Sequence, residues 1–330
     1  MSDFLVVEAP FMSEAIGGMQ DGLSELVDLN ELSEPSGRDG HRGLDGLGGL
    51  SGPGGRDVHR GLDGFVAFTT LAERSSGGVA SFREDSEEDA RRELEVSLAP
   101  LKLTWLSLEH AGVVAQIPTN SFEHEPHLRE SFSDESRARG ITADAGLVDA
   151  LEVNRARRIK ADAGLVGTPG HAFAFTTADC LPIVLVSKKH MLIAGIHAGW
   201  RGLAKDVIEN CCQAFAARFG GTMPEDVQGW IGPAIAARDY EVDSSTRQTL
   251  LASPQVSVEH FSPTRLGHFL ADLRAMAVAK LTAMGLPSES IAICPGSTFA
   301  DTRYHSARRD GEASGRMATV VGIRYTDVRI

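Results

Sequence analysis

The feature that most constrains the fold is a closely spaced series of apolar segments that begins at Ala172. The sequence AFAFTTADCLPIVLVS holds two apolar segments separated by a polar break, and MLIAGIHAGWRG is a third apolar segment that ends in a polar cluster. Short apolar runs bounded by polar or turn residues are typical of strands that are buried on both faces. We therefore expect neighbouring buried strands whose ends carry the polar side chains.

The rest of the chain predicts a mixture of strands and helices without regular alternation. Helical periodicity is found in residues 84–98, 204–219 and 269–284, and further strands are expected at FVAFTT, LTWLSL, VQGWIGPAI, IAICPG and MATVVGI. Strands outnumber helices, and a doubly wound parallel sheet would need them to alternate. The sequence thus indicates an α+β fold with mixed sheets in a single domain.

Two segments are expected to lie outside the packed body. Residues 1–64 carry twelve acidic residues and four arginines, and a glycine-rich near repeat, GRDGHRGLDG and then GRDVHRGLDG, ends this range. Glycine loses much backbone entropy on folding and offers no side chain to bury, so we expect a disordered N-terminal arm. The body would then span residues 65–330, with residues 119–160, polar and mixed in charge, as an inserted surface segment.

Charge and composition exclude several classes of partner. The chain of 330 residues has a formal net charge of −13 and no basic stripe, which argues against a nucleic-acid backbone as ligand. It holds no apolar run near the roughly 20 residues that cross a bilayer, and its acidic start does not resemble a secretion signal. Four cysteines are too few for a disulfide scaffold, so we expect a reducing, cytoplasmic environment.

Two strand ends carry side chains that could perform chemistry. Asp179 and Cys180 lie where one apolar segment breaks, and His197, Trp200 and Arg201 lie where the next one ends. If the two strands are neighbours, Cys180 and His197 meet at the same edge of the sheet. A buried Cys or His is commonly structural, so the residues alone leave a structural and a functional interpretation open.

At this point the sequence resembles the laccase-domain family. The resemblance is carried by ADCLPIVL, IAGIHAGWRGL, WIGPAI followed by YEV, and the C-terminal HSARRDG and SGRMA, and it runs from Phe65 to Ile323 without the insert. Members of this family carry the older name polyphenol oxidase, and the resemblance implies a zinc-dependent purine nucleoside phosphorylase with adenosine deaminase side activity. It also implies a four-layer α+β sandwich.

The resemblance implies a zinc ion held by one Cys and two His. Cys180 and His197 match the family motifs directly, and the first His corresponds to His110, in the stretch LEHAG. His124 and His127, in the insert, are the alternatives to His110. Three protein ligands leave a fourth position open, as in catalytic rather than structural zinc sites. Copper is the less favoured metal.

Further residues in or near these motifs are candidates for substrate binding and catalysis. Asp162, in the second of two ADAGLV copies, corresponds to a family position, whereas Asp144 belongs to the insert. Arg201 is the preferred ligand for phosphate, since a guanidinium presents a fork of donors to an oxyanion. Arg308 and Arg316 are further substrate-binding candidates, and Asp179 would orient a zinc ligand or act as an acid or base. The expected partners are phosphate and the nucleosides adenosine, inosine, guanosine and methylthioadenosine.

Three alternatives are weighed against this function. A copper oxidase commonly uses paired His-x-His motifs, and the eleven histidines include no such pair. A cysteine hydrolase would use Cys180 as the nucleophile and His197 as the base, and zinc content separates it from the phosphorylase. An inactive binding protein of the same family is the third alternative, because an Asn-Leu-Gly segment usual in the family is missing here.

Overall fold

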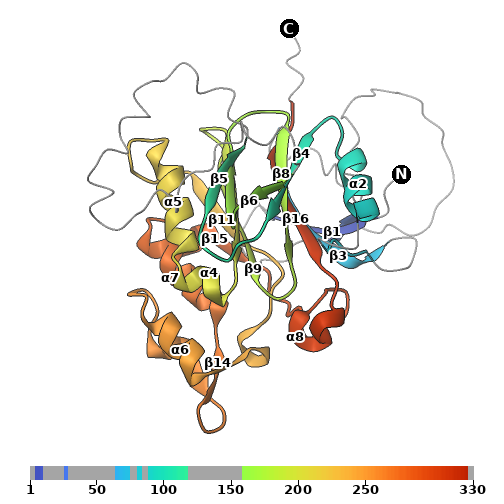
Figure 1. Ribbon diagram of the computed structural model, residues 1–330. Helices are drawn as coiled ribbons and strands as arrows, with labels where there is room; N and C mark the ends of the chain where they lie inside the picture. The colour runs from blue at the N-terminus through green and yellow to red at the C-terminus, as the bar shows by residue number, and fades with distance from the viewer. Residues whose placement is uncertain are drawn as a thin grey trace, which may run out of the picture.

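The protein contains two large mixed sheets packed face to face, with helices against the outer face of each (Figure 1). The computed structural model describes residues 4–9, 26–28, 64–74, 80–83, 88–117 and 158–325. None of the helices in these ranges is both long and apolar enough to cross a membrane.

The first sheet has seven strands in the spatial order β2-β1-β3-β16-β8-β4-β6. Strand β4 runs parallel to β6 and β8, and the other pairs are antiparallel. Their bounds are β1 Phe4–Glu8, β2 Leu26–Asp28, β3 Phe65–Arg74, β4 Lys102–Ser107, β6 Arg158–Lys160, β8 His171–Thr177 and β16 Met317–Ile323.

The second sheet has six strands in the order β15-β11-β9-β10-β7-β5, and a small third sheet has the order β12-β14-β13. In the six-stranded sheet, β5–β7 and β11–β15 are the parallel pairs. The bounds are β5 Val114–Ile117, β7 Ala163–Val166, β9 Leu181–Ser187, β10 Leu192–Ala198, β11 Val227–Ile231, β12 Glu241–Asp243, β13 Phe261–Pro263, β14 His268–Ala271 and β15 Ile291–Ile293.

The helices connect and cover these sheets. The α-helices are α2 Glu88–Ser97, α4 Trp200–Ala204, α5 Val207–Ala217, α6 Ser244–Leu251, α7 Leu273–Ala283 and α8 Ala307–Asp310. Short 3-10 helices are η5 Ala237–Asp239, η6 Val258–His260, η7 Ser288–Ser290 and η8 Gly311–Ala313.

Three apolar cores separate four layers. Because side chains alternate along a strand, β9 contributes Val184 to the core between the two sheets and Ile183 to the core beneath α5 and α7. On the other side, Val320 of β16 packs with Leu94 of α2. The order is therefore helix, sheet, sheet, helix, which confirms the α+β class and the sandwich that the family resemblance implies.

Three connections pass from the seven-stranded to the six-stranded sheet at one end of the sandwich. Residues 108–113 join β4 to β5, residues 161–162 join β6 to β7, and residues 178–180 join β8 to β9. Strands β4, β6 and β8 run parallel, so they all end at the same edge. The fold therefore gathers three short polar connections in one place.

Several predicted boundaries differ from the structure. The expected helix over residues 204–219 is divided into α4 and α5, because Asp206 takes a left-handed conformation with φ 57°. The helix expected over 269–284 begins only at Leu273. The residues before it pair with β12 and β13 as strand β14, and the Asp272 side chain accepts a hydrogen bond from the Ala275 N–H at the start of α7.

The two segments expected to lie outside the body also contribute strands. Within the predicted arm, β1 and β2 extend the seven-stranded sheet, and the Ala9 N–H donates to the Ala67 carbonyl. The apolar sequence FLVVE suits a strand and was outweighed by the glycine-rich residues that follow it. Within the predicted insert, β6 pairs with β4, and Ile159 is buried. The other residues of 1–63 and 118–157 lie outside the described residues.

We expect Gly195→Ala to destabilise the protein through the contact between the sheets. A Cβ at Gly195 would lie 2.7 Å from Val321 Cγ2 and 3.0 Å from ring atoms of Phe173 and Phe175. Overpacking of this kind costs about 1–3 kcal/mol. The free energy of unfolding in urea should fall by that amount. Gly229→Ala is the matched control, since its Cβ would meet no atom closer than 3.4 Å; equal stability losses would contradict the account.

Candidate functional site

The three connections between the sheets bring the candidate residues together. His110 lies in the β4–β5 connection, Asp162 in the β6–β7 connection, and Asp179 and Cys180 in the β8–β9 connection. His197 comes from the antiparallel strand β10, which ends at the edge where β9 begins. Cys180 and His197 thus share one edge of the sheet, as the sequence predicts.

His110 and His197 form a pair at this edge. Their ring centroids are 5.0 Å apart and the rings lie nearly perpendicular. His197 is only 3% exposed, and burial lowers its pKa to about 3, with His110 acting in the same direction. The His197 ring is therefore neutral at physiological pH, which is the form that binds a metal ion.

Cys180 lies directly before β9, beside the end of β10. Leu181 pairs with Ala198, and a Cβ at Gly199 would lie 2.7 Å from the Cys180 Sγ. A larger residue at position 199 would crowd the thiol in its present position. Burial raises the pKa of Cys180 to about 12, Asp179 adds to this effect, and Arg316 and Arg201 oppose it.

The donor types at this edge are those that zinc prefers. Two imidazoles and one thiol form a nitrogen and sulfur set with a place left for a further ligand. The imidazoles of His110 and His197 lie side by side, and the Cys180 thiol lies at the beginning of the neighbouring strand β9. Across the described residues, no group of three or more His, Cys, Asp or Glu side chains is arranged so that it could hold a metal ion. The residues fit zinc by their chemistry, and their role as ligands stays a prediction.

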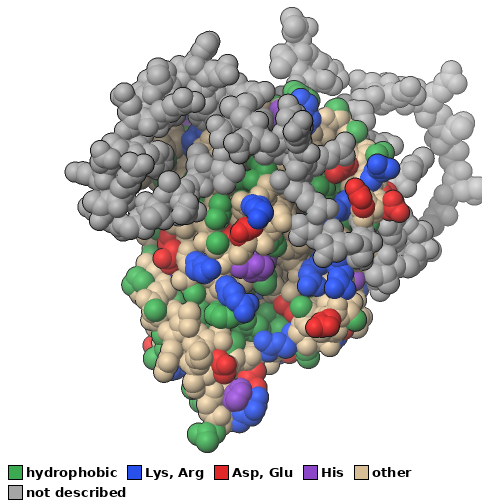
Figure 2. All heavy atoms as spheres, viewed as in Figure 1, with side chains coloured by type: hydrophobic (Ala, Val, Ile, Leu, Met, Phe, Trp, Pro, Cys, Tyr) green, Lys and Arg blue, Asp and Glu red, His purple; other side chains and the backbone are tan. Residues whose placement is uncertain are grey.

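All three predicted arginines interact electrostatically with Cys180 or Tyr240. Arg201 and Arg316 both lower the pKa of Cys180, and Arg201 and Arg308 both lower the pKa of Tyr240, although burial raises that pKa to about 12 overall. In the space-filling view, Lys, Arg and His side chains gather between α4 and α8 (Figure 2). An anionic ligand would be attracted to this face.

Each arginine is held differently. The exposed Arg201 guanidinium lies 4.5 Å from the centre of the Trp200 ring, and none of the ion pairs between described residues includes it. Arg308 stacks 4.7 Å from the Tyr240 ring and donates to the Glu241 carbonyl at 2.8 Å. Arg316 donates from Nη1 to the carbonyls of residues 314 and 315.

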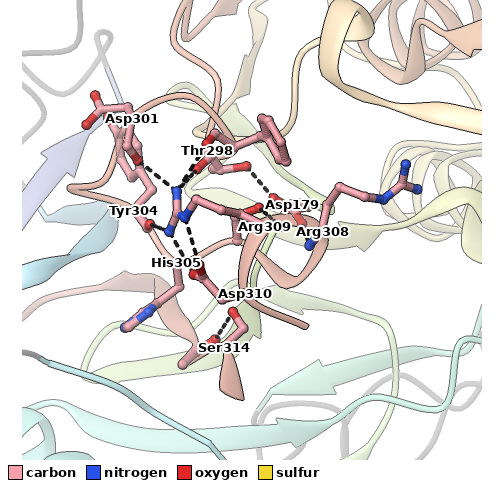
Figure 3. A network of polar contacts seen from close by, with 12 residues as sticks. Asp179, Thr298, Asp301, Tyr304, His305, Arg308, Arg309, Asp310 and Ser314 are labelled. Carbon is pink, nitrogen blue, oxygen red and sulfur yellow. Dashed lines mark hydrogen bonds and ion pairs between the residues drawn. The ribbon is translucent and has the colours of Figure 1, made fainter. Parts of the chain in front are cut away.

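Asp179 holds the first turn of α8, which carries Arg308. Its Oδ1 accepts a 2.7 Å hydrogen bond from the Thr298 hydroxyl, and its Oδ2 accepts one of 2.7 Å from the Arg308 backbone N–H (Figure 3). The residue is 7% exposed and has φ 87°, a conformation that non-glycine residues rarely adopt. Both carboxylate oxygens are therefore engaged in positioning the chain around the site.

Two residues of the site are not predicted from the sequence. Tyr240 stands in the YEV segment that supported the family resemblance, but nothing in its spacing indicated contact with Arg308. Thr298 contacts Asp179 across 119 residues of sequence, and no motif marked it. The alternative ligands His124 and His127, and the duplicate Asp144, lie outside the described residues.

Comparisons with known proteins identify the family of this chain. A family model described as multi-copper polyphenol oxidoreductase laccase matches residues 90–324. The chain is 39% identical over 155 residues to a purine nucleoside phosphorylase of Xylella fastidiosa, and 33% identical over 159 residues to the purine nucleoside phosphorylase YfiH of Escherichia coli. Each alignment covers 47% of this chain, and they span 57% and 60% of those relatives.

Solved structures share the fold. The YfiH protein of Bacillus licheniformis superposes with a TM-score of 0.61 at 20% identity, over 79% of this chain and 93% of that one. YlmD of Geobacillus stearothermophilus gives a TM-score of 0.60 at 23% identity, over 84% of this chain and 98% of that one. At these identities the likeness concerns the fold alone.

Proposed function

This chain belongs to the family described as multi-copper polyphenol oxidoreductase laccase, and we propose that it is a purine nucleoside phosphorylase with a zinc ion at the edge formed by β9 and β10. Curated relatives carry the name purine nucleoside phosphorylase. The observation that carries the proposal is the placement of cationic residues beside the histidine pair: Arg201 lies in α4, directly after β10, and Arg308 is attached to Asp179, the neighbour of Cys180. Arg201 and Arg316 also act electrostatically on Cys180.

In the proposed reaction, an oxygen of phosphate forms a bond to the ribose C1′ while the bond from C1′ to the purine nitrogen breaks. The electron pair leaves with the purine, which takes up a proton. Arg201, exposed and stacked on Trp200, would hold the phosphate by charge-assisted hydrogen bonds. Arg308 and Arg316 would bind further substrate oxygens, and Asp179 would keep α8, which carries Arg308, in place.

Zinc would be held by His110, Cys180 and His197, and its positive charge would stabilise negative charge that develops on the substrate. Adenosine deamination, as a slower side activity, is favoured by the same donor set, because other zinc deaminases use His and Cys ligands. We expect inosine, guanosine, adenosine and methylthioadenosine as substrates for phosphorolysis.

Two rival functions are less well supported. A cysteine hydrolase would use Cys180 as a free nucleophile, whereas curated relatives carry the name purine nucleoside phosphorylase. Zinc content separates the two, since a metal-bound thiolate is not a free nucleophile. Copper oxidase chemistry would require more histidine ligands in paired motifs than this sequence contains.

The proposal predicts that release of free base from inosine depends on phosphate. Zinc-loaded protein purified without an affinity tag should release hypoxanthine with phosphate present and almost none without it. Equal release in both conditions would indicate hydrolysis instead. Binding of inosine without any turnover would identify an inactive family member.

A further inference from the structure

A buried carboxylate holds the loop that carries His110. Asp162 is 0% exposed, and its two oxygens accept four consecutive backbone N–H groups. Oδ1 accepts from Glu109 at 3.0 Å and from His110 at 2.6 Å, and Oδ2 accepts from Ala111 at 2.7 Å and from Gly112 at 2.8 Å. Hydrogen bonds to a charged acceptor are about twice as strong as neutral ones, so this is a firm attachment.

The same residue also contacts the second histidine through its main chain. The His197 N–H donates to the Asp162 carbonyl oxygen at 2.8 Å. Asp162 therefore connects to His110 with its side chain and to His197 with its backbone. The backbones of the two histidines, whose ring centroids lie 5.0 Å apart, are thus both attached to this one residue.

The His110 loop needs such support because of its backbone conformation. His110 has φ 53°, in the left-handed region that is uncommon for non-glycine residues, and Gly112 has φ 79°. The opposite side of the loop is closed by α5, where the Asn210 amide donates to the Gly112 carbonyl at 3.0 Å. A Cβ at Gly112 would lie 2.6 Å from the Lys205 carbonyl oxygen. The loop is thus clamped between Asp162 and α5.

Asp179 occupies the corresponding position in the neighbouring connection. Both residues follow an alanine at the point where the chain passes from one sheet to the other, in the sequences ADA and ADC. Asp179 binds a segment distant in sequence, the first turn of α8, through the backbone N–H of Arg308. The two aspartates therefore attach different segments around the same site.

We propose that Asp162 is the positioning residue that sets the relative placement of His110 and His197, and thereby the zinc affinity of the pair. Both of its carboxylate oxygens accept backbone N–H groups, so Asp162 would act through the two histidines and not as a ligand itself. This inference rests on the proposed zinc site.

Asp162→Asn tests it with a minimal change of shape. The amide replaces one oxygen acceptor with an N–H₂ donor that faces two N–H groups, so the loop loses half of its attachment. Loss of residues that orient a metal ligand typically lowers metal affinity about 10- to 100-fold. We expect a fall of that size in zinc affinity, measured by competition with a chelator, together with faster amide hydrogen exchange at residues 109–112.

Asp272→Asn is the matched control, because Asp272 also accepts a backbone N–H, from Ala275 at 2.9 Å at the start of α7. Asp272→Asn should leave zinc affinity unchanged. The inference would be overturned if Asp162→Asn bound zinc as tightly as the wild type, or if both variants lost zinc affinity equally. If Asp162→Asn does not fold, Asp162→Glu decides, because it keeps the carboxylate and shifts it relative to the four N–H groups. Reduced zinc affinity at unchanged melting temperature then supports the inference, and unchanged affinity overturns it.

The outcome separates this inference from the proposed function. If the wild-type protein binds no zinc, the zinc site itself fails, and with it the stated role of Asp162. If the wild type binds zinc and Asp162→Asn binds it equally well, only the role of Asp162 fails.

Discussion

Replacing Cys180 with alanine is expected to abolish stoichiometric zinc binding while the protein stays folded. The thiol is one of three expected zinc ligands. Without it, only the imidazoles of His110 and His197 would remain to hold the ion. Alanine keeps the Cβ and removes only the sulfur at the beginning of β9, where the backbone pairing with β10 is unaffected, so the protein should stay folded. Zinc per chain should fall from one to nearly none, and phosphorolysis should fall by more than the roughly 100-fold that marks loss of a supporting residue.

Metal analysis of tag-free protein measures this directly. Cys294→Ala is the matched control, since Cys294 is also a free cysteine, is 5% exposed and follows β15. It should keep one zinc per chain. Full zinc occupancy in Cys180→Ala would show that the thiol is not a ligand.

Replacing Arg201 with alanine is expected to weaken the use of phosphate far more than adenosine deamination. Only phosphorolysis needs a bound phosphate, and Arg201 is an exposed cation that no described carboxylate pairs with at this site. A hydrogen bond to a charged group contributes about 1.5–3 kcal/mol, which corresponds to roughly a 10- to 100-fold loss in kcat/KM for phosphate. Deamination should change less than about twofold on the same scale.

Steady-state kinetics with inosine and varied phosphate, compared with adenosine deamination, test this separation. Arg92→Ala removes an exposed arginine from α2, beyond the outer face of the seven-stranded sheet, and should alter neither reaction. If Arg201→Ala lowered both reactions equally, Arg201 would act through the structure of α4 and not through phosphate.

The central strands and the histidine and cysteine at their ends could be predicted from the sequence. The apolar segments of β8, β9 and β10 are continuous and bounded by polar residues, so their period and length identify them. The placement of Cys180 beside the end of β10 then follows from pairing of adjacent strands. Helix ends were predicted less well, because the left-handed turn at Asp206 has no marker such as glycine.

The supporting contacts could not be predicted, since they join residues far apart in sequence. Asp162 contacts residues about 50 positions earlier, and Thr298 contacts Asp179 from 119 positions away. Strand β1 depends in the same way on distant partners, because β3 pairs with it on one side and β2 on the other. Whether such a segment forms a strand depends on its tertiary packing and not on its local composition.

The central claim is that this site transfers the ribose of a purine nucleoside to phosphate. Phosphorus NMR of the zinc-loaded protein with inosine and phosphate tests it most directly, because the product of phosphorolysis carries a new phosphate ester. We predict that the phosphate signal declines while a ribose 1-phosphate signal grows in equal amount with free hypoxanthine. Hypoxanthine without ribose 1-phosphate, or no change in either signal with zinc fully bound, would contradict the claim.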